Sequence, residues 1–314
     1  MSEDASWEVG LARRIFMNER ELRAGWRFLI YVAVALLLLS AFGLAAVRLH
    51  APLPAKGVPA TPLALLDSEI LNLIGFLGAA VLMGKFEHRS FGVYGLPARG
   101  ALRKNFWVGI IWGFVMISAT MLLIHAWGGF TLGKIDLGSA AIFRYAAVWA
   151  GVFLAVGIAE NFTICGYTHF TLARGIRFWP AAILLSVVFG SLHLNNSGEG
   201  LAGALNVFVI GMFFFLTLRR TGNLWFSVGL HLAWDWGETY FYSVPDSGLV
   251  SPHHLYASSF HGATWLTGGT IGPEGSVMSF VVIGAAALLF ALLYRAPRRS
   301  PEAPGAEVAQ QIPT

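Results

Sequence analysis

Charged residues are scarce in this chain. Asp, Glu, Lys and Arg make up 12% of the 314 residues and 56% are hydrophobic, whereas charged residues reach about 25% in typical soluble domains. This composition excludes an ordinary soluble domain. Because Cys165 is the single cysteine, an internal disulfide and a multi-cysteine metal site are excluded as well. The chain also lacks an internal repeat of the kind that many transporters show.

Long apolar runs are what the chain has in abundance. A helix needs about 20 apolar residues to cross a bilayer. Eight runs approach or exceed this length: 26–49, 63–83, 106–127, 140–173, 178–194, 201–218, 224–242 and 277–294. The run 140–173 exceeds one bilayer thickness, so we expect it to tilt, bend or project beyond the bilayer. The sequence therefore predicts an all-α, polytopic membrane protein with about eight transmembrane helices.

Arginine and lysine cluster in alternate connections between these runs. The opposite connections carry only Arg48, Lys56, Lys134 and Arg144. Positive residues favour the cytoplasmic side, so we expect both termini in the cytoplasm and a multi-pass protein of a bacterial inner (plasma) membrane. The basic composition reflects this topology signal, and we expect no nucleic-acid partner.

The runs and connections divide the chain into six expected parts. The connection between the last two runs contains several prolines and glycines, and its aromatic residues favour an ordered cap over disorder. The first segment mixes apolar and basic residues, as in a helix lying on an anionic leaflet or in a positive flank that sets topology. The parts are a cytoplasmic amphipathic segment (1–25), about three transmembrane helices (26–139), a core of about four helices (140–242), an extracytoplasmic loop (243–276), the last transmembrane helix (277–295) and a disordered tail (296–314).

Among the ionisable residues inside the apolar runs of the second half, four are two acids and two histidines that can form one polar site, namely Glu160, His193, His231 and Asp235. An ionisable side chain at membrane depth costs roughly 2.5–3.5 kcal/mol on insertion scales, which makes each a candidate functional residue. His231 and Asp235 are four residues apart and share one helix face. Counted along the helix rise, all four lie about 10–22 Å from the cytoplasmic edge, compatible with one shared cavity.

This set of residues allows more than one chemistry. A Glu and a His facing each other can activate water, and a second His with a carboxylate can stabilise an oxyanion. Two His and one carboxylate can instead hold zinc, although the chain lacks the His-Glu-x-x-His spacing of the commonest zinc proteases. Structural hydrogen bonding between helices is the third possibility.

The order of these residues resembles the three sequence motifs of the CPBP family. This family of intramembrane proteases includes the type II CAAX prenyl endopeptidases and bacteriocin-immunity proteins. The resemblance covers about residues 140–242 and implies a four-helix catalytic core. The matching motifs are Glu160 followed by Gly166-Tyr167, Phe189-x-x-x-His193, and His231-x-x-x-Asp235, where many relatives carry Asn in place of the Asp.

The resemblance implies a role for each matched residue. Glu160 and His193 would activate the attacking water, and His231 and Asp235 would stabilise the oxyanion, with Phe189 as a supporting residue. The family's first motif reads Glu-Glu-x-x-x-Arg-Gly, but Asn161 and Cys165 replace its second Glu and its Arg here. The resemblance implies that these two positions are supporting ones and that the family's Glu and Arg form a buried ion pair. Losing both members of such a pair costs less than losing one, so we expect the fold to survive.

Other potentially reactive residues have structural explanations. Cys165 lies about 140° around the helix from Glu160, and we expect a buried structural cysteine. We expect His169 at a helix end or interface, and His253, His254 and His261 in the long loop.

We therefore expect an intramembrane endopeptidase of the CPBP/CAAX-protease type that acts on a peptide or lipidated-protein substrate among membrane lipids. Because the first motif is altered, a catalytically impaired relative that acts as a membrane scaffold or binding protein is an alternative. Because intramembrane acids and histidines also serve in proton relays, a proton-coupled transporter is a second alternative. We favour a site without a cofactor. If zinc is present, Glu160, His193 and His231 are its expected ligands.

Overall fold

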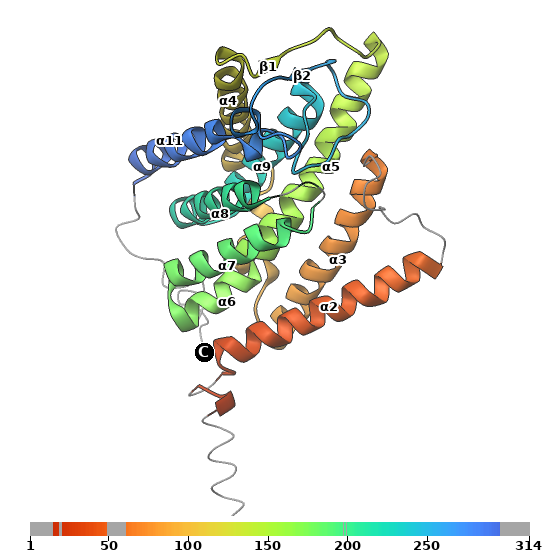
Figure 1. Cartoon of the computed structure of the whole chain (residues 1–314). Helices are drawn as coiled ribbons and strands as arrows, with labels where there is room; N and C mark the ends of the chain where they lie inside the picture. The colour runs from red at the N-terminus through yellow and green to blue at the C-terminus, as the bar shows by residue number, and fades with distance from the viewer. Residues whose placement is uncertain (1–14, 19–20, 49–60, 197, 199, 296–314) are drawn as a thin grey trace, which may run out of the picture.

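The computed structural model describes residues 15–18, 21–48, 61–196, 198 and 200–295 (Figure 1). Residues 1–14 and 19–20 of the expected amphipathic segment, and the whole expected tail 296–314, lie outside these ranges.

Helices account for most of the described chain, and each expected apolar run falls on helical structure (Figure 1). The long helices are α2 (Ala24–Arg48), α3 (Pro62–Phe86), α4 (Lys104–Ala126), α5 (Ser139–Cys165), α6 (Tyr167–Ile176), α7 (Phe178–His193), α8 (Leu201–Thr221), α9 (Trp225–Trp236) and α11 (Val277–Leu293). The short elements are η1 (Phe91–Tyr94), η2 (Ala98–Gly100), the π-helical turn η3 (Gly237–Tyr242), α10 (Thr264–Thr267), η4 (Pro273–Gly275), β1 (Phe130–Thr131) and β2 (Ser259–Phe260).

Five helical segments are long and apolar enough to cross a membrane, namely α2, α3, α4, α8 and the combined α5–α6. The apolar helices α7 and α11 are shorter, and α9 continues directly into η3. The expected all-α, polytopic fold is confirmed, and the chain is an integral membrane protein.

The longest apolar run is interrupted at Gly166. This residue separates α5 from α6 with a non-helical ψ of −128°. A Cβ atom at this position would lie 2.4 Å from the carbonyl oxygen of Phe162, so a larger residue would collide with the preceding turn. A glycine therefore lets the run of 38 helical residues break at this point.

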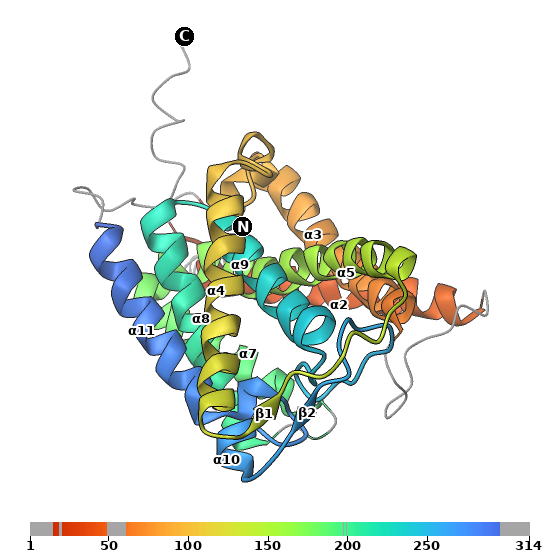
Figure 2. The same ribbon diagram turned by 90° about the horizontal axis from the view of Figure 1, so that it is seen from above.

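The most extensive helix–helix contact is between α4 and α9, which lie side by side in both views (Figures 1 and 2). Three glycines bring the backbones together. A Cβ at Gly109 or Gly113 would lie 2.1 Å from a carbonyl oxygen of α9, and one at Gly229 would lie 2.2 Å from the carbonyl oxygen of Phe106. Small residues spaced four apart allow such close packing between apolar helices. This contact fixes α9, which carries two of the candidate site residues.

The connection between η3 and α11 is folded over one end of the bundle. β2 pairs antiparallel with β1, with Phe130 opposite Phe260, and a bridge joins Ile135 to Tyr256. At Gly272 the backbone has φ +98°, and a Cβ would lie 2.0 Å from the carbonyl oxygen of Pro245. The close packing at Gly272 holds the two ends of the connection together.

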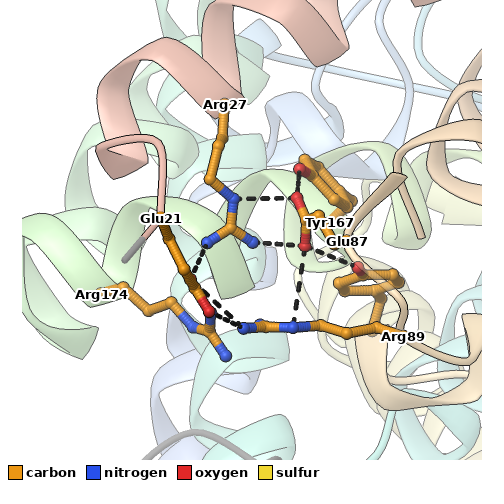
Figure 3. Close-up of polar contacts among 7 residues, drawn as sticks. Glu21, Arg27, Glu87, Arg89, Tyr167 and Arg174 are labelled. Atoms are coloured by element: carbon orange, nitrogen blue, oxygen red, sulfur yellow. Dashed lines mark hydrogen bonds and ion pairs between the residues drawn. The ribbon is translucent and has the colours of Figure 1, made fainter. Parts of the chain in front are cut away.

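At the opposite end, a polar network joins α2, α6 and the segment that follows α3 (Figure 3). The Glu87 carboxylate is its centre. It accepts hydrogen bonds from Arg27 of α2, from Tyr167 of α6 and from Tyr94. Arg27 is buried, and its Nε donates to Oε1 of Glu87 over 2.8 Å. The network therefore connects the N-terminal helices to the start of α6 directly after the first motif.

Candidate functional site

Glu160, His193 and His231 converge from three helices. Oε2 of Glu160, on α5, lies 4.0 Å from Nε2 of His193 at the end of α7. The same oxygen lies 3.8 Å from Nε2 of His231 on α9. Asp235, one turn further along α9, places Oδ2 3.5 Å from that His231 nitrogen. The structure therefore brings the four sequence-predicted residues into one cluster.

These four side chains differ in exposure. Asp235 is the most enclosed, with 5% of its side chain exposed, and Glu160 the least, with 29%. The two histidines lie between these values. Glu160 therefore has the most open access to whatever enters the site.

Asn161 holds the second histidine. Its amide Nδ2 donates to the carbonyl oxygen of Gly157 over 2.8 Å and lies 3.0 Å from Nδ1 of His231. The Gly157 carbonyl can only accept, so it fixes which end of the amide carries the hydrogens. Nδ1 of His231 must then be an acceptor, and the ring proton is placed on Nε2, the nitrogen that faces Glu160 and Asp235.

His193 has the opposite arrangement. Its Nδ1 lies 2.9 Å from the carbonyl oxygen of Phe189, which can only accept a hydrogen bond. Nδ1 therefore carries the proton, and Nε2 presents a lone pair toward Glu160. The Phe189 ring meets the imidazole edge-on at a centroid distance of 4.8 Å. Phe189 thus positions His193 through both its backbone and its side chain.

The cluster opens into a central cavity of about 190 Å³. Apolar residues such as Phe153, Phe214 and Trp234 form part of its wall. The rest of the wall combines neutral polar side chains, such as Asn206 and Ser251, with carboxylates. Its carboxylates are Glu69, Glu160, Asp235, Asp246 and Glu274, and no Lys or Arg of the described chain lines it.

Glu160 and His193 also border a second space of about 370 Å³, which we call the side groove. It lies between α2 and α3 on one side and α5 and α7 on the other. Its walls are largely apolar and include Leu39, Phe76 and Leu192. Among the described residues Glu160 is the single acid in this lining, so the Glu160–His193 pair lies between a cavity with five carboxylates and a groove without further acids.

The three expected zinc donors do not close around one point. Within the described ranges, one group of three or more His, Cys, Asp or Glu residues has all its donor atoms within 4.8 Å of one another, and it consists of Glu238, Asp246 and Glu274. Glu160, His193 and His231 are not such a group. Four-coordinate zinc, with ligands at about 2.0–2.2 Å, requires all of its donor atoms to lie closer to one another than 4.8 Å. Glu160, His193 and His231 do not fit a zinc ion in this arrangement.

Several residues singled out from the sequence lie away from the cluster. Cys165 is fully buried among core residues. His169 lies against Phe178 and Phe215, with Nε2 3.2 Å from the Phe178 carbonyl oxygen. The loop histidines contact their own surroundings: His253 stacks on Tyr145, His254 lies against the Tyr256 carbonyl, and His261 lies against Ser259.

Sequence reasoning missed four acids near the cavity. Glu69 on α3 and Glu238 on η3 both fall inside apolar runs and are buried. The rule that identified Glu160 would have found them. Asp246 and Glu274 lie in the connection after η3, where no pattern in the sequence indicates that they reach the cavity.

The fold and the cluster define a class of protein: an α-helical integral membrane protein with carboxylate and imidazole groups enclosed by its helices. Residues 141–237, from α5 to the start of η3, match the family model described as Rce1-like, type II CAAX prenyl endopeptidase. This match confirms the resemblance seen in the motifs and supports, at the level of the family, a membrane endopeptidase of the CAAX-protease type. No curated protein and no solved structure gives a significant match.

Proposed function

We propose that this protein hydrolyses a peptide bond within the membrane, with Glu160 and His193 activating the water. The observation that carries the proposal is the position of the Glu160 carboxylate within 4.0 Å of both imidazoles. A separation of this size leaves room for a water molecule that hydrogen-bonds to Glu160 and to the Nε2 lone pair of His193.

In the proposed reaction, the water attacks the carbonyl carbon of the substrate while Glu160 accepts one of its protons. The carbonyl π bond opens and its electrons form an oxyanion. Collapse of the tetrahedral intermediate breaks the C–N bond, and the proton held by Glu160 passes to the departing amine. The products are a carboxylic acid and an amine, so no oxidant or reductant is needed.

His231 supplies the oxyanion contact in this proposal. Its Nε2–H is directed toward the cluster because Asn161 occupies Nδ1. A hydrogen-bond donor that is already in position stabilises negative charge as it develops in the transition state. Asp235, 3.5 Å from the same nitrogen, orients the ring.

The side groove supports a substrate with an apolar part. Its apolar residues could hold a hydrocarbon chain or an apolar helix end beside Glu160 and His193, while water reaches the pair from the central cavity with its five carboxylates. A lipidated protein or a hydrophobic peptide fits this division, and the CAAX proteases act on prenylated proteins. No metal is needed in this mechanism, because water activation and oxyanion binding account for all four polar side chains.

A non-catalytic scaffold is the second candidate, since Asn161 and Cys165 depart from the first motif of the family. The two functions differ in whether the purified protein turns over substrate.

The test is cleavage of prenylated CAAX-type peptides and of unmodified hydrophobic peptides by the purified protein in lipid vesicles. We expect turnover that falls by about 10²–10⁴-fold in Glu160→Gln and in His193→Ala, the range for removing a general base. Asp235→Asn should keep much of the activity, because an amide can still orient His231 and donate to an oxyanion.

His261→Ala is the matched control, since this exposed histidine lies in the loop, and it should cleave like the unmodified protein. Full turnover by folded Glu160→Gln would contradict the mechanism. Absence of turnover with every peptide, together with specific binding of one of them, would favour the scaffold. Zinc that co-purifies stoichiometrically and is lost together with activity on chelation would overturn the metal-free site.

A further inference from the structure

A second group of acids lies beside the central cavity, outside the proposed catalytic cluster. Glu238 belongs to η3, Asp246 to the connection after it, and Glu274 to η4 before α11. One carboxylate oxygen of each lies within 4.8 Å of the others. Two oxygens on opposite sides of a Ca²⁺ ion, each at about 2.4 Å, are separated by about 4.8 Å. The three oxygens therefore lie no further apart than two ligands of one calcium ion can.

Glu238 gives independent support for a ligand. Its side chain is completely buried, and neither of its carboxylate oxygens has a hydrogen-bond partner among the described residues. The Trp234 side chain is near the carboxylate but outside hydrogen-bond geometry. A buried carboxylate without a donor is costly, and a cation held between it and its two acidic neighbours would remove that cost.

The surroundings supply further oxygen atoms and no competing positive charge. Thr239 Oγ1 donates to Asp246 over 3.0 Å, and the backbone N–H of Ser247 donates to Glu274 over 3.1 Å. The hydroxyl of Ser247 also contacts Glu274. No Lys or Arg of the described chain lines the adjoining cavity. Carboxylate and hydroxyl oxygens are the ligands of hard divalent cations, and carboxylates that can bind with one or both oxygens suit Ca²⁺ better than Mg²⁺.

We propose that Glu238, Asp246 and Glu274 form a calcium site that fastens the connection between η3 and α11 over the central cavity. The three ligands come from three segments that are separated along the chain, so one ion would cross-link them. The site is distinct from the Glu160–His193 pair and does not depend on peptide cleavage.

The experiment uses the full-length protein in detergent after treatment with a chelator. Tb³⁺ luminescence, excited through nearby tryptophans such as Trp234, reports occupancy, and Ca²⁺ or Mg²⁺ is added as competitor. We expect one saturable site, displaced by Ca²⁺ at lower concentration than by Mg²⁺, and a melting temperature that rises with Ca²⁺ as expected for binding to the folded state.

Two isosteric variants and two controls locate the site. Glu238→Gln and Glu274→Gln should each weaken Ca²⁺ binding at least about tenfold, since even second-sphere changes cost that much. Asp136→Asn removes an exposed acid in the connection between β1 and α5 and should bind normally. Glu160→Gln should also bind normally, which separates this site from the proposed catalytic one.

Two results would overturn the proposal. One is the absence of saturable Ca²⁺ binding by the unmodified protein up to about 10 mM, above the roughly 10⁻³ M at which weak calcium modules bind. The other is unchanged binding in both Glu238→Gln and Glu274→Gln. If either variant fails to fold, the calcium-dependent melting shift of the unmodified protein and the surviving variant decide the question.

Discussion

The two histidines of the cluster present the same nitrogen, Nε2, to Glu160, but in opposite protonation states. His193 is anchored through Nδ1 by the Phe189 carbonyl, and His231 is anchored through Nδ1 by the Asn161 amide. One ring therefore offers a lone pair and the other an N–H. In the proposed mechanism, this difference assigns water activation to one histidine and oxyanion binding to the other.

Asn161→Ala tests whether that assignment matters. Loss of the amide leaves Nδ1 of His231 without a hydrogen-bond donor. An unsatisfied buried polar group costs about 1–3 kcal/mol. If this cost falls on the transition state, kcat should fall by roughly 5–150-fold. KM should change little, because Asn161 lies behind the imidazole. Steady-state kinetics and the ¹⁵N chemical shifts of His231 are the measurements.

Asn161→Asp is the informative companion variant. A carboxylate at this position accepts a hydrogen bond, so it favours a proton on Nδ1 of His231 and leaves Nε2 without one. We expect a larger fall in kcat than for Asn161→Ala and a change in the imidazole ¹⁵N pattern. Unchanged kinetics and unchanged shifts in both variants would show that Asn161 does not set the tautomer.

The sequence identifies the four residues of the cluster but not the contact that orients His231. The cost of an ionisable group in a membrane singled out Glu160, His193, His231 and Asp235, which the structure places together. The partner of Asn161 could not be found in this way. The contact depends on the register between α5 and α9, 70 residues apart, and no local pattern sets it.

At the scale of the elements, the close contact between α4 and α9 predicts that a larger residue at its glycines destabilises the fold. Gly113→Ala places a Cβ 2.1 Å from the carbonyl oxygen of Leu230, so the two helices must separate. Overpacking of this kind typically costs about 1–3 kcal/mol, and thermal melts in detergent should show a lower transition temperature. Gly151→Ala on α5, where a Cβ meets nothing within 4 Å, is the matched control. Equal melting temperatures for the two variants would contradict the close-packing argument.

For the network around Glu87, we expect the buried ion pair to contribute more to stability than the exposed one. Glu87→Gln removes the buried carboxylate partner of Arg27 and leaves only the more exposed Glu21 carboxylate beside it (Figure 3). Breaking a buried ion pair typically costs about 3–5 kcal/mol. Glu21→Gln removes a carboxylate that is 56% exposed, and surface pairs contribute under about 1 kcal/mol. Denaturation of the two variants should therefore differ clearly. A larger loss of stability in Glu21→Gln than in Glu87→Gln would contradict the assignment of the Arg27–Glu87 pair as the main stabilising contact.

Helix positions were predictable because long apolar runs have few alternatives in a membrane. The expected runs fall on helices, and the excess length of the run 140–173 corresponds to the break at Gly166. The fold of the connection after η3 was not predictable in detail. Its pairing of β2 with β1 joins residues 130 positions apart, and its turns depend on contacts such as that between Gly272 and Pro245.

For the whole molecule, the alternation of basic connections predicts that the η3–α11 connection faces away from the cytoplasm. Labelling of introduced cysteines by a maleimide tests this orientation. The native Cys165 is fully buried, so it should react slowly with the maleimide and contribute little background labelling. His261→Cys should be labelled by a membrane-impermeant maleimide in intact cells. Arg99→Cys, exposed in the segment between α3 and α4, should be labelled only after the membrane is permeabilised. The reverse pattern would invert the proposed orientation.

The position of Glu160 and His193 between the central cavity and the side groove has a pharmacological consequence. The cavity is lined by five carboxylates, whereas Glu160 is the single acid of the described chain in the groove lining, which also includes Leu39 and Phe76. A small basic compound and a lipid-like compound would therefore occupy different spaces and meet only at the carboxylate–imidazole pair. Joining the two by a short linker across that pair would combine their binding energies in one molecule, and such a bivalent inhibitor would block both spaces at once.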